Sequence, residues 1–532
     1  MARAAVATAR GGGLARPRHG RPPAALVGAA GFAAALVLLP VAFTILQATQ
    51  VSLHDAIDLL VRPLVGLLLV NTLSLIAATT VAAAIIGTAA AWCVERTALP
   101  GRRAWAVLAA VPLAVPPFIS SYAWVSISNG FQDFAGAFLV VTFAYYPLVY
   151  LPVAAALRGL DPALEETARS LGQSPWGSFR RVVLPQLRPA LLGGMLLVAL
   201  DTLVEFGAFA LLRFRTFTTE LYAQYRTGLD GPDSSLLAVV LVALCLLCLV
   251  TEVRVRGHAR YARVGGGARR VAVPLALGWA RWPIVGAFAA LIVLTLGVPL
   301  GTIGFWLLQH AQAATSPVVP SPALLARATL ASVGLGAAGS AAAVALALPL
   351  AYLATRYLGT WVTVLERIAY LAQGVPGIVI ALALISLTVE AVRPLYQSAA
   401  LLVITYAILF LPLALVSVRA TIAQVQRRLE ETGRSLGLGW FAVVRRVLLP
   451  LAGPGLGAAA AMVFVAVVTE LTSTLLLAPI GTRTLATQVW ANTSSLAFAA
   501  AAPFAAMMLL ISLASTWLLA RRFGAAAFPR LG

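Results

Sequence analysis

One segment of this sequence occurs twice, 265 positions apart. The stretches Leu164–Pro189 and Leu429–Pro454 align without a gap, and 14 of their 26 paired positions are identical. A shorter match lies upstream at an offset of 260, where Val115-Pro116 recurs as Val375-Pro376. An internal repeat constrains the architecture of the whole chain more strongly than any single helix or strand does. We therefore expect two copies of one folding unit.

The duplicated segment is polar, whereas most of the chain around it is apolar, with a mean hydropathy of +0.93. Twelve apolar runs, six per copy, are long enough to cross a bilayer as helices, which takes roughly 18 to 20 residues. They predict an all-α polytopic membrane protein, because a helix satisfies its own backbone hydrogen bonds in lipid. The runs are 24–48, 65–92, 104–127, 134–157, 190–212 and 235–252 in the first copy, and 283–308, 325–354, 367–390, 398–418, 455–478 and 499–520 in the second.

The basic residues indicate the orientation of these spans. All 38 of them are arginines, and all but seven fall on one side if the N-terminus is cytoplasmic. This excess of arginine on one side follows the positive-inside rule. The distribution of the net charge of +20 therefore indicates a chain in a lipid bilayer and no nucleic-acid partner. The first run exceeds a signal-peptide core in length, and we interpret it as an uncleaved helix. Both termini are then expected in the cytoplasm.

The repeat and the twelve apolar runs divide the chain into five parts. Six spans per copy place both copies in the membrane in the same orientation, related by a pseudo-twofold axis along the membrane normal. The expected parts are a basic cytoplasmic tail (1–23), the first repeat (24–253), a cytoplasmic linker (254–282), the second repeat (283–522) and a cytoplasmic tail (523–532).

Several paired residues are candidates for a translocation pathway. Pro116 and Pro376 interrupt the third span of each copy, since proline removes a backbone donor, and broken helices at matching positions often line a central pathway. Proline is also common in membrane helices for purely structural reasons. Further candidates on this pathway are Tyr146 with its copy Tyr406, and Glu205 with its copy Glu470.

Three acidic residues lie well inside predicted spans, where ionisable groups are costly and often functional. They are Asp201, Glu205 and Glu470, and the first two are four residues apart, which would place them on one helix face. Carboxylates are hard oxygen donors and favour a cationic cargo. Glu205 and Glu470 are therefore candidates for transient metal contact. The structural alternative is that these groups make hydrogen bonds between helices.

The duplicated polar segment predicts a helical elbow. Asp161-Pro162 is a suitable helix start, with aspartate as N-cap and proline in the first turn. Gly172 is expected to end this short helix. A second helix is expected to begin at Arg180-Arg181 and to stop at Leu184-Pro185. Such an elbow is suited to enter a groove on a partner protein.

The elbow resembles the cytoplasmic EAA loop of ABC importer permeases, through Glu166-Thr167-Ala168, Gly172 and their copies. Over the whole duplicated chain, the layout is similar to fused permeases of the ferric-iron type. The resemblance implies the type I permease fold, coupling loops at 158–189 and 419–454, two ATPase subunits at these loops and a substrate-binding protein at the outer face. It also implies that the loop residues Glu165, Glu166, Arg169, Gly172, Glu430, Glu431, Arg434 and Gly437 act in coupling, with the two arginines adding ion pairs at the contact.

The chain is not expected to be an enzyme. A phosphate-binding loop needs a lysine, and the sequence has none, so ATP and magnesium are expected only on the partner ATPase subunits. Cys245 and Cys248 lie in an apolar span, where they are expected to pack against other helices. Ferric iron is the expected cargo, with thiamine or another small cation as the nearest competitor. A twelve-span ion-coupled transporter and a non-transporting assembly or sensor protein are alternatives from other classes.

Overall fold

The computed structural model describes residues 22–227, 232–256, 274–309 and 321–527. Most of the predicted basic tail, the middle of the linker and the last five residues lie outside these ranges. The described residues form helices throughout, apart from one isolated bridge between Thr97 and Leu275. The expectation of an all-α protein is confirmed.

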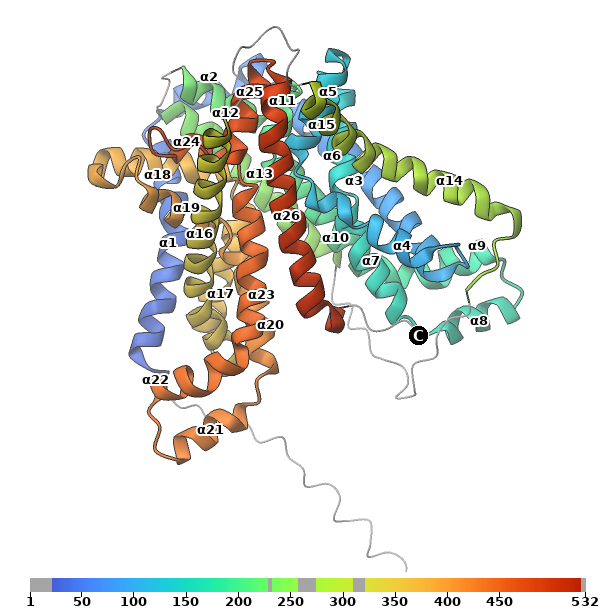
Figure 1. Cartoon of the computed structure of the whole chain (residues 1–532). Coiled ribbons are helices and arrows are strands. Elements are labelled where there is room, and N and C mark those ends of the chain that lie inside the picture. Colours follow the sequence, from blue (N-terminus) through green and yellow to red (C-terminus); the bar gives the residue numbers. More distant parts are fainter. Residues whose placement is uncertain (1–21, 228–231, 257–273, 310–320, 528–532) are drawn as a thin grey trace, which may run out of the picture.

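The helices follow the same order in the two halves of the chain (Figure 1). Those of the first half are α1 (Ala24–Ala48), α2 (Leu53–Val61), α3 (Pro63–Arg96), α4 (Arg102–Leu108), α5 (Pro117–Ile127), α6 (Phe134–Tyr145), α7 (Pro147–Gly159), α8 (Pro162–Ser170), α9 (Pro175–Ser178), α10 (Leu184–Val204), α11 (Gly207–Leu211), α12 (Phe217–Arg226) and α13 (Pro232–Arg256). Those of the second half are α14 (Arg281–Ile292), α15 (Val298–Gln309), α16 (Pro322–Arg356), α17 (Thr360–Leu371), α18 (Gly377–Ala391), α19 (Ala399–Leu409), α20 (Leu411–Gln424), α21 (Arg427–Ser435), α22 (Trp440–Val443), α23 (Leu449–Val468), α24 (Thr472–Leu477), α25 (Leu485–Ser494) and α26 (Phe498–Ala527).

The twelve predicted spans have counterparts in the described helices. Nine continuous helical segments are long and apolar enough to cross a membrane, and three bent pairs bring the number to twelve. The predicted runs 190–212 and 455–478 were displaced, because the helices there run over 176–204 and 440–468. Large apolar side chains stay exposed along α1, α3 and α16, as expected of surfaces that face lipid.

The third span of each half is broken at the predicted proline. In the first half the chain bends by 89° between Ala114 and Pro117, and in the second by 103° between Gly374 and Gly377. Pro116 and Pro376 occupy the two breaks in extended conformation, just before the next helix. The prediction that these prolines interrupt the third span is confirmed. Each break is covered by other helices of the chain, as irregular backbone at membrane depth requires.

The first span of each half packs against the other half. Helix α1 contacts α16, α17 and α18 of the second half besides α13 of its own half, and α15 contacts α5 of the first half besides α26 of its own half. Buried side chains of α1 accordingly belong to a core cluster dominated by the second half. A further cluster joins α5 of the first half with α15 and α26 of the second. This packing of each first span on the other half ties the two halves together.

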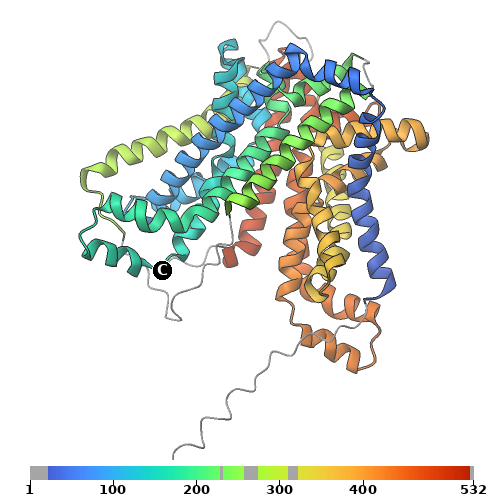
Figure 2. The same ribbon diagram turned by 180° about the vertical axis from the view of Figure 1, so that it is seen from behind.

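The duplicated loops α8–α9 and α21–α22 lie at the same end of the molecule (Figures 1 and 2).

Candidate functional site: two coupling loops and an axial contact

The first elbow helix, α8, begins as its sequence predicts. The side chain of Asp161 accepts a hydrogen bond from the backbone N–H of Ala163 at 3.0 Å, and Pro162 occupies the first turn. The chain leaves the helix through Gly172 with φ of +85°, and Gly437 does the same in the second copy with φ of +86°. This left-handed conformation costs a residue with a side chain about 1 to 2 kcal/mol, which explains glycine at both positions.

The predicted second helix of the elbow was wrong at both of its ends. In the first half, helix begins at Pro175, passes through a π-helical turn at Phe179–Val183 and continues into α10 without stopping at Pro185. The π turn shifts the hydrogen-bond register, so that Leu184 N–H donates to the carbonyl of Phe179. Pro185 is the second residue of α10 and follows directly on the π turn.

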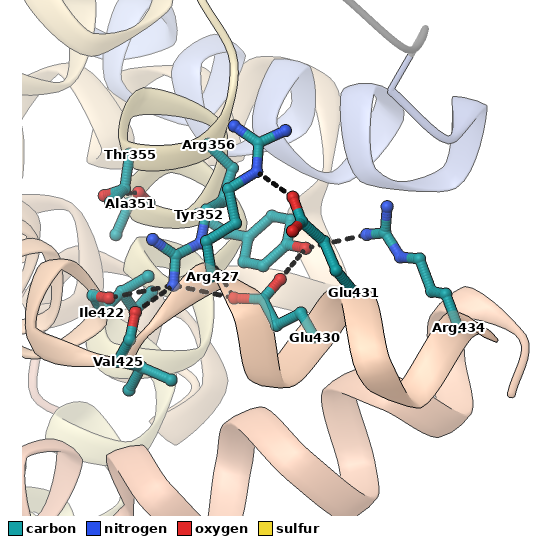
Figure 3. Close-up of polar contacts among 10 residues, drawn as sticks. All are labelled: Ala351, Tyr352, Thr355, Arg356, Ile422, Val425, Arg427, Glu430, Glu431 and Arg434. Carbon is teal, nitrogen blue, oxygen red and sulfur yellow. Dashed lines mark hydrogen bonds and ion pairs between the residues drawn. The ribbon is translucent and has the colours of Figure 1, made fainter. Parts of the chain in front are cut away.

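In the second half, the elbow is attached to the membrane helices by a buried ion pair (Figure 3). The carboxylate of Glu430 on α21 accepts hydrogen bonds from Arg356 Nε at 2.9 Å and from Tyr352 Oη at 2.8 Å. Arg356 Nη2 lies 2.7 Å from the same carboxylate and also donates to the carbonyls of Ile422 and Val425. Arg356 ends α16, so one guanidinium joins the second span, the end of the fourth span and the elbow.

The first half holds its elbow differently. Glu165, the counterpart of Glu430, pairs with Arg169 of its own helix at 2.8 Å. Arg96 ends α3 as Arg356 ends α16; it is buried and interacts electrostatically with Glu165. Arg96 Nε nevertheless has no hydrogen-bond partner within the described part of the chain. The backbone just after α3 is held instead by the linker, since Leu275 N–H donates to the carbonyl of Arg96 at 2.9 Å.

The remaining predicted coupling residues divide into an outer and an inner set. Glu166 and Glu431 are exposed, and Glu431 pairs with Arg427 of α21 at 3.2 Å. The role of Arg169 and Arg434 in ion pairs with a partner stays a prediction, and within the chain both make other contacts. Arg169 pairs within α8, and Arg434 donates to Tyr352 Oη at 3.4 Å.

Three large apolar side chains of each loop are strongly exposed, and they are the same in both copies. Their exposed fractions are 49% and 44% for Leu164 and Leu429, 77% for both Leu171 and Leu436, and 69% for both Trp176 and Phe441. We call these residues the apolar triads of the two loops. Sequence reasoning missed them, although their recurrence at an offset of 265 was visible. Aromatic and leucine side chains exposed at one end of a protein are typical of a protein–protein contact.

Two of the predicted acidic residues, Glu205 and Glu470, lie where the fifth span of each half breaks, and Asp201 lies one turn earlier within α10. Helix α10 ends at Val204, so Glu205 lies just past the helix that carries Asp201, and the two carboxyl groups still lie close enough for their charges to interact. Glu205 Oε1 accepts a hydrogen bond from Ala208 N–H at 2.8 Å, and Oε2 accepts one from Tyr145 at 2.8 Å. Glu470 repeats this geometry, with Oε1 accepting from Ser473 N–H at 2.9 Å. Both carboxylates thus cap the short helix that follows, and the bond from Tyr145 of α6 to Glu205 is of the kind that the structural alternative proposed, between helices.

The two breaks meet where the halves touch. A Cβ atom on Gly207 would lie 2.8 Å from Leu471 Cδ2, so the first break lies in close contact with the second. The ring of Phe206 lies 5.4 Å from that of Trp490 and 4.7 Å from that of Tyr222. Glu205 and Glu470 are close enough for their charges to interact. The structure therefore brings these two predicted residues together between the halves.

The other predicted pathway residues are placed less directly. Pro376 precedes Gly377, whose Cβ position lies 3.7 Å from Glu470 Oε1, so the break of the third span adjoins the acidic residue. Tyr146 and Tyr406 are fully buried in their own halves; Tyr406 Oη lies 2.6 Å from Thr474 Oγ1, and its Cβ lies against Gly339. Within the described residues, no group of three or more His, Cys, Asp or Glu side chains is arranged to hold a metal ion.

Comparison with known proteins agrees with this architecture. The family model for the inner membrane component of binding-protein-dependent transport systems matches twice, at residues 83–260 and 343–522. The chain is 35% identical over 475 residues to the Fe(3+)-transport system permease protein FbpB 2 of Haemophilus influenzae, covering 89% of this chain and 93% of that protein.

More distant relatives match part of the chain. The sulfate transport system permease protein CysT of Salmonella typhimurium is 30% identical over 41% of this chain and 86% of its own. The molybdenum transport system permease protein ModB of Escherichia coli is 27% identical over 30% of this chain and 80% of its own. The two matched units, the twelve spans and the paired loops agree, and the chain belongs to the inner-membrane components of binding-protein-dependent transport systems, with two such units fused in one polypeptide.

Proposed function

We propose that this chain is the permease of an ABC importer for ferric iron, powered by ATPase subunits on separate polypeptides. The observation that carries the proposal is the pair Glu205 and Glu470, two carboxylates at equivalent helix breaks where the halves meet. Two acidic groups placed together at membrane depth favour a cation over an anion. The FbpB 2 relative, whose name states Fe(3+) transport, supports iron over other cations.

The partners follow from the same architecture. Two ATPase subunits dock on the coupling loops, at the cytoplasmic face that the arginine distribution indicates. ATP and magnesium are bound there, outside this chain. A substrate-binding protein docks at the opposite end, on the loops 213–234 and 479–498 that contain α12 and α25.

Closure of the ATPase pair would move the loops and, through them, the membrane helices. In the second half the Arg356–Glu430 pair transmits this movement to α16, and in the first half the linker and α8 transmit it to α3. The halves then rotate as rigid bodies about their pseudo-twofold axis, which separates the breaks at Glu205 and Glu470. The cation passes between the two carboxylates as they part.

The test is ATP-dependent uptake of radiolabelled ferric iron into proteoliposomes that contain this chain, its ATPase and its binding protein, with thiamine and sulfate as parallel cargoes. Iron uptake supports the proposal. Thiamine or sulfate uptake without iron uptake would overturn the cargo. Proton-driven uptake without the ATPase would overturn the importer class.

The acidic pair is tested by Glu205→Gln with Glu470→Gln, because glutamine keeps one oxygen that accepts the capping N–H and removes the charge. At position 205 the change also removes the second oxygen, which accepts from Tyr145. We expect iron uptake to fall at least tenfold, with retention of the ATPase subunits unchanged. Asp58→Asn, on an exposed helix away from the axis, is the matched control. Normal uptake in the double variant would limit both glutamates to their capping role.

A further inference from the structure

Helix α2 (Leu53–Val61) lies at the end of the molecule opposite the coupling loops and joins α1 to α3 (Figures 1 and 2). Residues 49–52 separate it from α1, and Arg62 alone separates it from α3. Both neighbours are membrane spans, so α2 is held at the level where these spans leave the bilayer.

The helix has three distinct faces. Leu59 is buried, on the side where α2 contacts α3 and α13. A second face carries the charged side chains His54, Asp55 and Asp58. The third face is an apolar stripe at positions i, i+4, i+7 and i+8, with exposed fractions of 79% for Leu53, 52% for Ile57, 40% for Leu60 and 75% for Val61.

The charged face and the helix start need no partner beyond α2 itself. Ser52 Oγ accepts a hydrogen bond from Asp55 N–H at 3.1 Å and donates to Asp55 Oδ2 at 2.6 Å. His54 Nε2 lies 3.5 Å from Asp58 Oδ2, and both side chains are mostly exposed. The polar face is therefore suited to water, whereas the apolar stripe is not covered by any described part of the chain.

The spans on either side show what covers the stripe. Ile45 and Leu46 at the end of α1 and Leu67 and Val70 near the start of α3 are exposed apolar residues as well. The stripe thus continues the lipid-facing surface of two membrane helices. A short helix with one apolar face, one charged face and membrane spans at both ends matches an interfacial amphipathic helix.

We propose that α2 lies in the lipid–water interface of the outer leaflet, with its apolar stripe in the acyl boundary and its charged face in water. Helix α1 packs on the second half, whereas α3 belongs to the first half. Because α2 joins the two at the membrane surface, it fixes the level in the bilayer at which α1 passes from one half to the other. The proposal rests on the membrane location of the chain and not on its cargo.

The test is spin labelling of single cysteines in the full-length chain, reconstituted in phosphatidylethanolamine–phosphatidylglycerol nanodiscs. The three native cysteines are replaced by alanine, and Ile57→Cys or Val61→Cys reports the stripe while Asp58→Cys reports the charged face. We expect labels at 57 and 61 to collide several-fold more often with oxygen than with a water-soluble nickel chelate. The label at 58 is expected to show the reverse preference.

Equal access of the nickel chelate to all three labels would overturn the proposal. Immobilisation of the labels at 57 and 61 by the purified binding protein, with loss of their contact to lipid, would overturn it too, because the stripe would then be a protein contact. Two independent stripe positions keep the test decisive if one variant does not fold.

Discussion

The two coupling loops expose the same surface but are attached to the membrane helices by different contacts. Each exposes an apolar triad of two leucines and one aromatic residue to nearly the same extent. Behind that surface, Glu430 makes a buried ion pair with Arg356 of another helix (Figure 3). Glu165 instead pairs with Arg169 of its own helix.

The different attachments behind a shared surface indicate that the loop motif has two functions, contact with a partner and attachment to its own half. Two copies of the same exposed surface suit two equivalent partner grooves, which fits the proposed pair of ATPase subunits. The inner contacts have only to hold each loop on its half, and different sets of contacts do this. We therefore expect the first glutamate of each pair to position the elbow and the apolar triad to be the surface offered to the partner.

The largest effect expected from this comparison is that of Glu430→Ala, with Glu165→Ala as its matched control. Removing Glu430 leaves Arg356 buried without its partner, which costs about 3 to 5 kcal/mol. Removing Glu165 breaks a partly exposed pair within one helix, worth about 1 kcal/mol or less, and buried Arg96, which also interacts with Glu165, keeps the nearby charge of Glu95. Hydrogen exchange should rise strongly over 427–435 in the first variant and little over 162–170 in the second. Equal increases would refute the difference between the two attachments.

The apolar triads are tested by Trp176→Ala and Phe441→Ala. Both side chains are exposed, so we expect the permease itself to keep its thermal stability. Truncation of an aromatic residue at the centre of a contact costs about 2 kcal/mol or more, or roughly a thirtyfold weaker affinity for the ATPase. Binding of the purified ATPase measures this, and Trp279→Ala, an exposed tryptophan of the linker, is the control. Unchanged affinity in both loop variants would show that the triads are not the docking surface.

Tyr352→Phe sharpens the comparison inside the second loop. The change removes the hydroxyl that donates to Glu430 and accepts from Arg434 and leaves the ring in place. A hydrogen bond to a charged group contributes about 1.5 to 3 kcal/mol, so local exchange over 427–435 should rise, but less than in Glu430→Ala. Tyr357→Phe, on a neighbouring ring, should leave it unchanged. An effect as large as that of Glu430→Ala would assign the anchor to the tyrosine.

Much of this fold was predictable from local sequence signals. The twelve spans follow from apolar runs, the broken third spans from Pro116 and Pro376, and the elbow from Asp161 and Gly172. Each of these signals acts through the residue's own backbone or through its contact with lipid. No knowledge of distant contacts was needed.

The attachments of the loops were not predictable, because they join residues far apart in the chain. Arg356 and Glu430 are 74 positions apart, and the only signal was that an arginine recurs at the end of each second span. The position of Glu205 beyond its helix also escaped prediction, since the break after Val204 lies at a contact between Gly207 and Leu471 of the other half. The same applies to the apolar triads, because exposure depends on the finished fold.

The smallest expected effect concerns the linker at the first loop. Leu275→Pro removes the N–H that donates to the carbonyl of Arg96, whereas Leu275→Ala keeps it. One such hydrogen bond contributes about 1 kcal/mol, so exchange over 162–170 should rise modestly in the proline variant and stay unchanged over 427–435. The second loop should not respond, because Arg356 bonds to carbonyls of its own half. If both loops loosened together, or if Leu275→Ala acted as strongly as Leu275→Pro, the linker would not be a specific support of the first loop.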